Sequence, residues 1–218
     1  MTTSPYHHGN LREALVEAAV DVVREGGPEA LALRELARRV GVSHNAAYRH
    51  FADREALVDV AAGRALEALV ATIHRRLARV HDKDPVRRAR RRLMEIGAGY
   101  VEFALQESGL FRLLFTAYPE PPEGKEADGT GDDPYGMLNA ALDDLVAVGY
   151  LSAGDRAGTD VTCWSAVHGF AVLNVEGPLR GLSMAEREGA LAGLLHDIDR
   201  GLGVGGDWPP LSDSSSNP

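Results

Sequence analysis

The sequence has a single cysteine, Cys163, so the chain cannot form an internal disulfide bond. Metal sites built from several thiolates are excluded for the same reason. No window approaches the roughly 18 uncharged apolar residues that a membrane-spanning helix needs. The first ten residues also lack the apolar core of a secretory signal peptide. These absences lead us to expect a cytoplasmic protein.

Aromatic residues make up only 6% of the chain, and β-branched residues are sparse. Alanine, leucine, arginine and glutamate dominate instead, and these residues favour helices over strands. A chain of 218 residues is long enough to bury a sizeable core. The composition therefore predicts an all-α protein. Apolar periodicity indicates about nine helices, with no convincing strand and no internal repeat.

The usual signatures of catalysis are missing as well. We find no nucleophile elbow, no phosphate-cradling glycine loop and no paired carboxylates at a catalytic spacing. His196, Asp197 and Asp199 could suggest a metal site, but His196 and Asp197 are adjacent on a helix and point apart. A surface helix end explains these three residues better. We therefore expect no enzyme, no metal and no cofactor.

The net charge of −9 argues at first against a nucleic-acid partner. The charge is unevenly distributed, however. Residues 1–54 are neutral overall, residues 55–92 carry +5, and residues 93–218 carry −14. Within the first segment, residues 31–54 hold five arginines against two acids. A second basic run, residues 87–92, is interpreted as a solvated helix end, with a nucleic-acid contact as the alternative.

The pattern of residues 33–54 predicts two short helices joined by a tight turn; the sequence is LRELARRVGVSHNAAYRHFADR. Leu36, Ala37 and Val40 give the first helix one apolar face. Gly41 follows where a helix end needs positive φ, and Ser43 can cap the second helix. That second helix is rich in polar and aromatic residues, which is unusual for a core helix. The pattern predicts a helix-turn-helix that presents its second helix to the DNA major groove.

Apolar stripes predict further helices along the rest of the chain. One begins near Asn10 and stops at the Gly26-Gly27-Pro28 sequence, and a long helix begins after Asp53, which can cap it. Others follow Pro85 and Gly109, and span Met137 to Gly149, residues 155–176 and residues 184–201. Residues 119–134 are expected to form a mobile loop and residues 204–218 a disordered tail.

The order and content of these elements resemble the TetR-like transcriptional regulators of bacteria. The similarity is most specific over residues 9–60, which include VGVS and YRHF, and is weak over residues 119–150. Trp164, His168 and Gly169 resemble a subgroup with a Trp-x3-His-Gly signature. The resemblance implies a DNA-binding domain over residues 1–53 and an effector-binding and dimerisation domain over residues 54–203. It also shows one departure: Ala32 stands where the family usually has Ser or Thr.

The resemblance further implies roles for individual residues. DNA bases would be contacted by His44, Asn45, Ala46 and Arg49. Phosphates would be contacted by Arg34, Tyr48, His50 and Arg54. Asparagine pairs with adenine through two hydrogen bonds, and arginine can reach guanine or a phosphate, so the chemistry agrees. Family members are homodimers, here through helices 155–176 and 184–201, which implies an inverted-repeat operator.

The resemblance also implies a small-molecule effector in the C-terminal domain. Candidates to line its pocket are aromatic or polar residues on otherwise apolar helices: Tyr100, Phe103, Phe111, Phe115, Trp164 and His168. Core packing is the competing explanation for each. Few charged residues lie among them, so we expect an apolar or aromatic effector. The sequence thus predicts a ligand-responsive repressor, with an activator or a helical protein-interaction module as alternatives.

Overall fold

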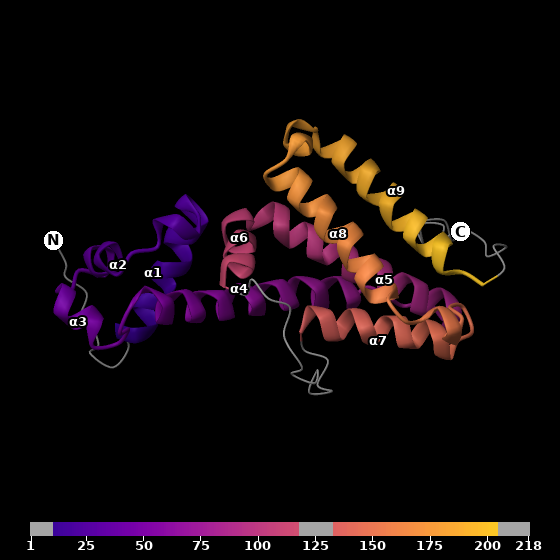
Figure 1. Cartoon of the computed structure of the whole chain (residues 1–218), viewed down its shortest axis with the longest axis horizontal. Coiled ribbons are helices and arrows are strands. Elements are labelled where there is room, and N and C mark those ends of the chain that lie inside the picture. Colours follow the sequence, from indigo (N-terminus) through magenta and orange to yellow (C-terminus); the bar gives the residue numbers. More distant parts are fainter. Residues whose placement is uncertain (1–10, 118–132, 205–218) are drawn as a thin grey trace. The chain divides into compact units, whose positions relative to one another are not determined.

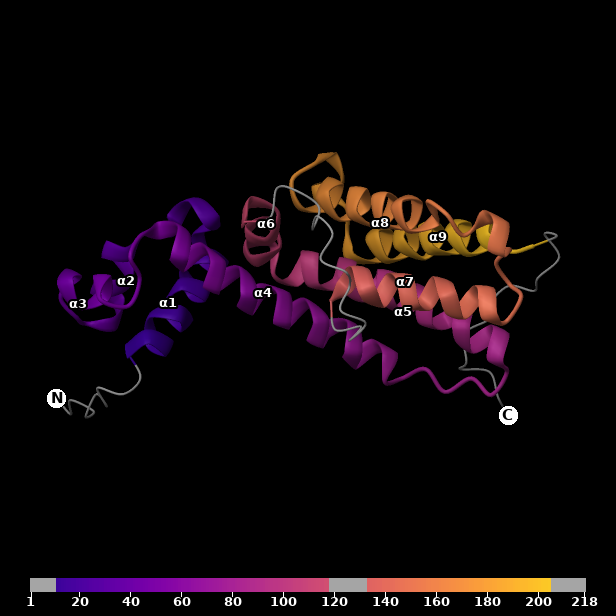
Figure 2. The same ribbon diagram turned by 60° about the horizontal axis from the view of Figure 1, so that its bottom comes forward.

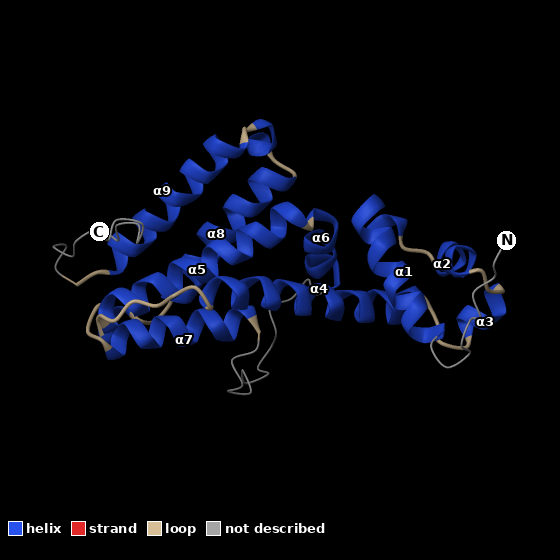
Figure 3. Ribbon diagram, turned by 180° about the vertical axis from the view of Figure 1, so that it is seen from behind, coloured by secondary structure: helices blue, strands red, loops and turns tan. Residues whose placement is uncertain are grey.

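The computed structural model describes residues 11–117 and 133–204. Over these two ranges the chain forms nine α-helices and three short 3₁₀ helices, and no strand (Figure 3). The predicted all-α fold is therefore confirmed. None of the described helices is both long and apolar enough to cross a membrane. The predicted loop and tail lie almost entirely outside the described residues.

The chain divides into two compact units that interleave in sequence. One holds residues 1–68 and 107–123, and the other holds residues 69–106 and 124–218. Helix α4 (Arg54–Leu77) contributes to both. This division differs from the predicted domain boundary at residue 53, because the start of α4 and a later helix pack with the N-terminal helices.

The N-terminal unit contains the predicted helix-turn-helix, made by α2 (Leu33–Val40) and α3 (His44–Tyr48). Gly41 has φ 75°, the left-handed conformation that glycine adopts without a steric penalty. Ser43 accepts a hydrogen bond from the Ala46 backbone N–H and so caps α3. Helix α1 (Leu11–Gly26) buries Leu15, Val16, Ala19, Val22 and Val23 behind this pair. The turn chemistry read from the sequence is confirmed.

Helix α6 (Ser108–Ala117) packs in the same unit, against α1 and η1 (Pro28–Ala30) (Figure 1). Gly109 lies so close to the Val23 carbonyl that a Cβ at this position would overlap it. Two ion pairs flank this contact, Arg24 with Glu107 and Arg112 with Glu29. The sequence predicted the helix, but not that it belongs to the N-terminal unit.

The second unit is organised around α5 (Pro85–Gln106), which contacts α7 (Pro134–Ala147), α8 (Thr159–Val175) and α9 (Met184–Leu202). Helix α7 runs beside α5, and α8 and α9 lie side by side in both views (Figures 1 and 2). The short helix η2 (Ala153–Asp155) precedes α8, and η3 (Pro178–Gly181) joins α8 to α9. Ser183 and Glu186 form a capping box that begins α9.

A buried ion pair joins α5 to α9. Arg90 and Asp199 are both 2% exposed, and two hydrogen bonds of 3.0 and 2.6 Å connect the guanidinium to the carboxylate. The Arg90 guanidinium lies 4.7 Å from the centre of the Tyr150 ring, and the Tyr150 hydroxyl donates to the Asp199 carbonyl. The prediction of a surface helix end at Asp199 was therefore wrong. Asp199 follows Leu195 by one helical turn, so it points into the core.

The arginine run of residues 87–92 is likewise not a simple solvated helix end. Arg87 and Arg91 both pair with Asp82, which precedes α5. Arg92 lies 3.5 Å from a carboxylate oxygen of Asp144 on α7. The side chain of Arg90 is in the core. Most of this positive charge is thus neutralised within the second unit.

Candidate nucleic-acid interface

Helix α3 is held by two buried residues and presents the rest of its surface to solvent. Ala47 is completely buried, and Phe51, just after the helix, is 2% exposed. His44, Asn45, Arg49 and His50 are exposed, and Ala46 is partly exposed. The predicted base-contacting residues therefore lie on the exposed side of α3 or, for Arg49, at its C-cap, as a major-groove reader requires.

Tyr48 does not bridge the helices as a packed core residue would. Its side chain is 46% exposed, and its ring meets the His44 ring edge to face, with centroids 4.6 Å apart. The hydroxyl is available to solvent or to a phosphate. The predicted phosphate contacts by Tyr48 and His50 remain predictions, and their exposure is compatible with them.

The arginines of the helix-turn-helix differ in whether they form ion pairs. Arg38 pairs with Glu35, and Arg39 bridges Glu35 and Glu25 of α1. Hydrogen bonds from these two arginines lower the pKa of Glu35 to about 2. Arg34 and Arg49 are exposed and make no ion pair within the described residues. Fewer arginines of the helix-turn-helix are without an ion pair than the number of arginines in its sequence suggests.

Helix α2 begins without a side-chain cap. Ala32 occupies the N-cap position in an extended conformation, with φ −141° and ψ 130°, and its methyl group accepts no hydrogen bond. A serine or threonine cap is typically worth about 0.5–2 kcal/mol. The departure noted in the sequence is thus confirmed as a missing cap in the folded chain.

Arg54 is tied to the backbone of its own unit. Its Nε donates to the Leu31 carbonyl at 3.0 Å, and one Nη donates to the Pro28 carbonyl at 2.8 Å. Both acceptors lie in the connection between α1 and α2. Arg54 therefore joins the start of α4 to that connection, and its predicted phosphate contact stays a prediction.

We expect Arg54→Gln to weaken DNA binding through loss of this clamp. Each charge-assisted hydrogen bond contributes about 1.5–3 kcal/mol, so we expect a loss of roughly that size in unfolding free energy. Affinity should then fall alike on all sequences, and fluorescence anisotropy across a salt series measures this. If Arg54 also contacts a phosphate, as predicted, the slope of log affinity against log salt becomes shallower by about one per subunit. An unchanged slope would contradict the phosphate contact.

The six predicted effector residues do not gather in one compact unit. Phe111 and Phe115 of α6 lie in the N-terminal unit, with their ring centroids 5.0 Å apart. Phe103 is 1% exposed and serves as core. The second unit brings together the other three, Tyr100, Trp164 and His168.

These three side chains form a polar aromatic cluster between α5 and α8. The Tyr100 hydroxyl lies 3.0 Å from Nδ1 of His168, and the Trp164 and His168 ring centroids are 6.5 Å apart. The Tyr100 hydroxyl can donate its proton to Nδ1 when that nitrogen of His168 is unprotonated. Burial disfavours the charged imidazolium and lowers the pKa of His168, so it favours the neutral ring.

Sequence reasoning missed two further members of the cluster. The Tyr135 ring of α7 lies 5.5 Å from the Trp164 ring, and its hydroxyl donates to the Asp160 carboxylate. That hydrogen bond holds the pKa of Asp160 below its usual value. Asp160 precedes Trp164 by four residues and so shares its face of α8, a spacing that could have revealed it.

His168 should make stability depend on pH. Burial holds its pKa below the ordinary 6.5, so the unfolded chain takes up a proton more readily than the folded one. Stability is therefore lost as the pH falls below about 6.5 and through the lowered pKa. Urea unfolding of the wild type and of His168→Gln at about pH 8 and about pH 5.5 measures this. The variant should lose less stability on acidification, and equal losses would contradict the role of His168.

Comparison with known proteins agrees with this architecture. Residues 15–61 match the family model described as bacterial regulatory proteins of the tetR family. Residues 93–198 match the model described as the tetracyclin repressor-like C-terminal domain. The chain carries both domains of the TetR family. The C-terminal match includes Trp164, His168 and Gly169, but the narrower Trp-x3-His-Gly subgroup stays a prediction.

Solved structures share the TetR-like fold. A Rhodococcus sp. RHA1 protein of unknown function is 29% identical, with a TM-score of 0.73 over 92% of this chain and 100% of its own. A tetR-family regulator from Streptomyces coelicolor is 19% identical, with a TM-score of 0.62 over 88% of this chain and 80% of its own. A TetR variant from Acinetobacter baumannii AYE, in complex with minocycline, is 22% identical, with a TM-score of 0.58 over 90% and 96%. No curated protein matches the chain.

Proposed function

We propose that this chain is a transcriptional regulator that reads double-stranded DNA with α3 and responds to a small molecule. The observation that carries the proposal is the exposure of His44 and Asn45 on α3 and of Arg49 and His50 directly after it. Ala47 and Phe51 anchor this segment in the core. Exposed donors and acceptors on such a helix can reach base edges in the major groove. His44 and Asn45 would read bases, and Arg49 a guanine or a phosphate.

The regulator would act as a homodimer through α8 and α9. Val161 and Leu173 on α8 and Met184 on α9 are large apolar side chains that are 43–76% exposed in the single chain. Exposed alanines and glycines accompany them on α9, and small residues let two helices approach closely. Two copies of α3 would then read two half-sites of an inverted repeat.

The effector would bind beside Tyr100, Trp164 and His168. The aromatic rings favour a ligand with apolar or aromatic surface, and His168 and Asp160 offer polar contacts. The TetR variant from Acinetobacter baumannii AYE, whose fold is similar to that of this chain, was solved in complex with minocycline. A hundredfold change in operator affinity needs about 2.7 kcal/mol of coupling, which lies within the usual range of roughly 1–3 kcal/mol.

Repression is our preferred outcome of DNA binding, because a dimer on an operator blocks access to a promoter. The same geometry would serve an activator. Transcription in vitro from a promoter that carries the selected operator distinguishes the two, since the purified protein lowers transcript yield in one case and raises it in the other.

Selection of bound duplexes from a random DNA pool tests the proposal most directly. We expect enrichment of an inverted repeat whose half-sites lie about one helical turn apart. Mass measurement of the complex should give two chains per duplex. Recovery of random sequence would overturn the proposal and favour a helical protein-interaction module.

A further inference from the structure

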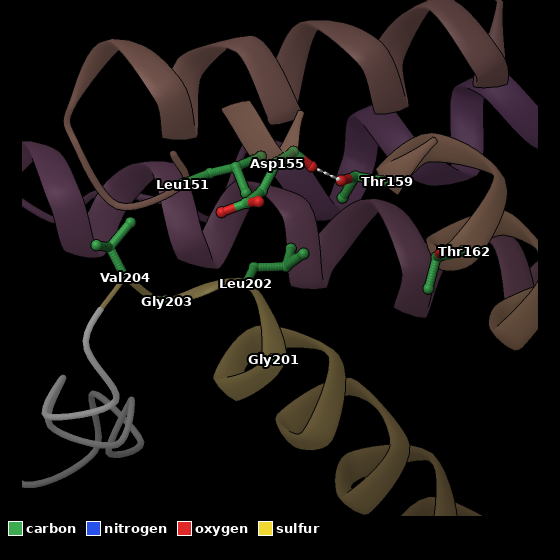
Figure 4. Close-up of a pocket in the computed structure, with 8 residues that line it drawn as sticks. All are labelled: Leu151, Asp155, Thr159, Thr162, Gly201, Leu202, Gly203 and Val204. Carbon is green, nitrogen blue, oxygen red and sulfur yellow. Dashed lines mark hydrogen bonds between the residues drawn. The ribbon is translucent and has the colours of Figure 1, made fainter. Parts of the chain in front are cut away.

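The second unit contains a cavity that the proposed function does not use. Its volume is about 380 Å³, and it lies between η2, the first turns of α8 and the end of α9 (Figure 4). This size is within the range of small-molecule pockets in proteins, near the lower end. The residues that line it are Leu151, Asp155, Thr159, Thr162, Gly201, Leu202, Gly203 and Val204.

The cavity is separate from the aromatic cluster of Tyr100, Trp164 and His168. Successive residues of a helix are about 100° apart, so Thr162 and Trp164 point to nearly opposite sides of α8. Neither Trp164 nor any of its aromatic neighbours lines the cavity. A ligand here would therefore contact different side chains from the proposed effector.

The polar groups around the cavity offer acceptors and little else. The Thr159 hydroxyl already donates to the Asp155 carbonyl at 2.6 Å, and the Thr162 hydroxyl donates to the Gly158 carbonyl at 3.2 Å. Figure 4 shows the first of these bonds. With their hydrogens engaged, both hydroxyls face a ligand with lone pairs only. The Val204 N–H is engaged as well, by the Tyr150 carbonyl.

Negative charge is concentrated at the same place. The Asp155 carboxylate lines the cavity and makes no ion pair with any described residue. Its neighbour Arg156 is turned to Asp143 and Asn139 and leaves Asp155 unneutralised. Helix α9 also ends here, at an extended Gly203, and the last carbonyls of a helix carry partial negative charge. Leu151, Leu202 and Val204 supply apolar surface beside these groups.

From this arrangement we infer that the cavity binds a small protonated amine with a short hydrocarbon chain. The ammonium group would donate to the Asp155 carboxylate and to the threonine hydroxyls, and the hydrocarbon would lie on Leu151, Leu202 and Val204. A neutral alcohol would lose the charge interaction, and a carboxylate would be repelled by Asp155. The inference goes beyond the proposed function. Binding of the amine would not depend on DNA binding or on the proposed response to an effector.

Titration of the full-length, ¹⁵N-labelled protein with hexylamine hydrochloride tests the inference. We expect saturable amide shifts at Thr159, Thr162, Gly201 and Gly203. Hexan-1-ol and sodium hexanoate match the chain length without the positive charge, and both should bind at least tenfold more weakly. Equal binding of the amine and the alcohol, or shifts spread over other helices, would overturn the inference.

Asp155→Asn keeps the shape of the cavity and removes its charge, and we expect at least tenfold weaker binding of hexylamine. Asp197→Asn is the matched control, because Asp197 is exposed on α9 and does not line the cavity. Its affinity for hexylamine should equal that of the wild type. Unchanged affinity in Asp155→Asn would also overturn the inference. Sedimentation velocity on both variants separates a lost site from an altered oligomeric state, since Thr162 adjoins the proposed dimer face.

Discussion

Asp199→Ala is expected to lower the free energy of unfolding by about 3–5 kcal/mol. The substitution leaves the Arg90 guanidinium buried at 2% exposure without its carboxylate partner. An uncompensated buried charge is among the most destabilising defects in a protein core, and domains have only about 5–15 kcal/mol in total. Urea unfolding followed by circular dichroism measures the difference.

Two controls separate the charge effect from simple loss of packing. The double variant Arg90→Met with Asp199→Leu removes both charges and keeps apolar volume, so it should recover most of the lost stability. Asp197→Asn, on the exposed side of α9, should change stability by less than about 0.5 kcal/mol. If the free energy of unfolding of Asp199→Ala lay within about 1 kcal/mol of the wild-type value, water would have to reach Arg90 in that variant.

Asn45→Ala should weaken binding to the selected operator by about 1–3 kcal/mol per half-site. A dimer carries two copies, so the loss for the whole complex is about 2–6 kcal/mol, or roughly 30-fold to 20,000-fold in affinity. Preference should also relax at one base pair in each half-site. Asn45 is exposed on α3, so the fold should be unaffected. Repeating the duplex selection with the variant measures both effects.

Tyr48→Phe provides the comparison for Asn45→Ala. A residue that positions the protein on phosphates carries no sequence information, so this variant should bind every duplex more weakly by a similar factor. A uniform loss in Asn45→Ala would contradict its base-reading role, and an altered preference in Tyr48→Phe would contradict the phosphate contact.

Local structure followed closely from the sequence. Gly41, Ser43 and Asp53 were predicted to end or cap helices from residue type and position alone, and each does so. These features depend on a few neighbouring residues, so sequence reveals them. The apolar spacing of α5 was equally informative, since Leu93, Ile96, Tyr100 and Phe103 are all buried.

Pairings across the chain were not predictable in the same way. The partner of Arg90 lies 109 residues away, and charge alone did not separate this arginine from its neighbours in the run. Arg90 lies three residues before Leu93 and therefore on the apolar face of the helix. That spacing could have identified Arg90 as the buried arginine of the run. The attachment of α6 to α1 and the acceptor-lined cavity depend on tertiary packing between segments that lie far apart in the sequence, and local residue patterns do not determine it.

The ion pairs of Arg38 and Arg39 have a consequence for how such a protein would search a genome. Glu35 and Glu25 pair with those two guanidinium groups, so among the arginines of the described residues 33–49 only Arg34 and Arg49 are exposed and without an ion pair. Affinity for random DNA grows with the number of phosphates neutralised. We therefore expect weak, short-lived non-specific binding to unrelated DNA sequences, so that most molecules are free in solution. The occupancy of the operator should then follow the concentration of the protein closely.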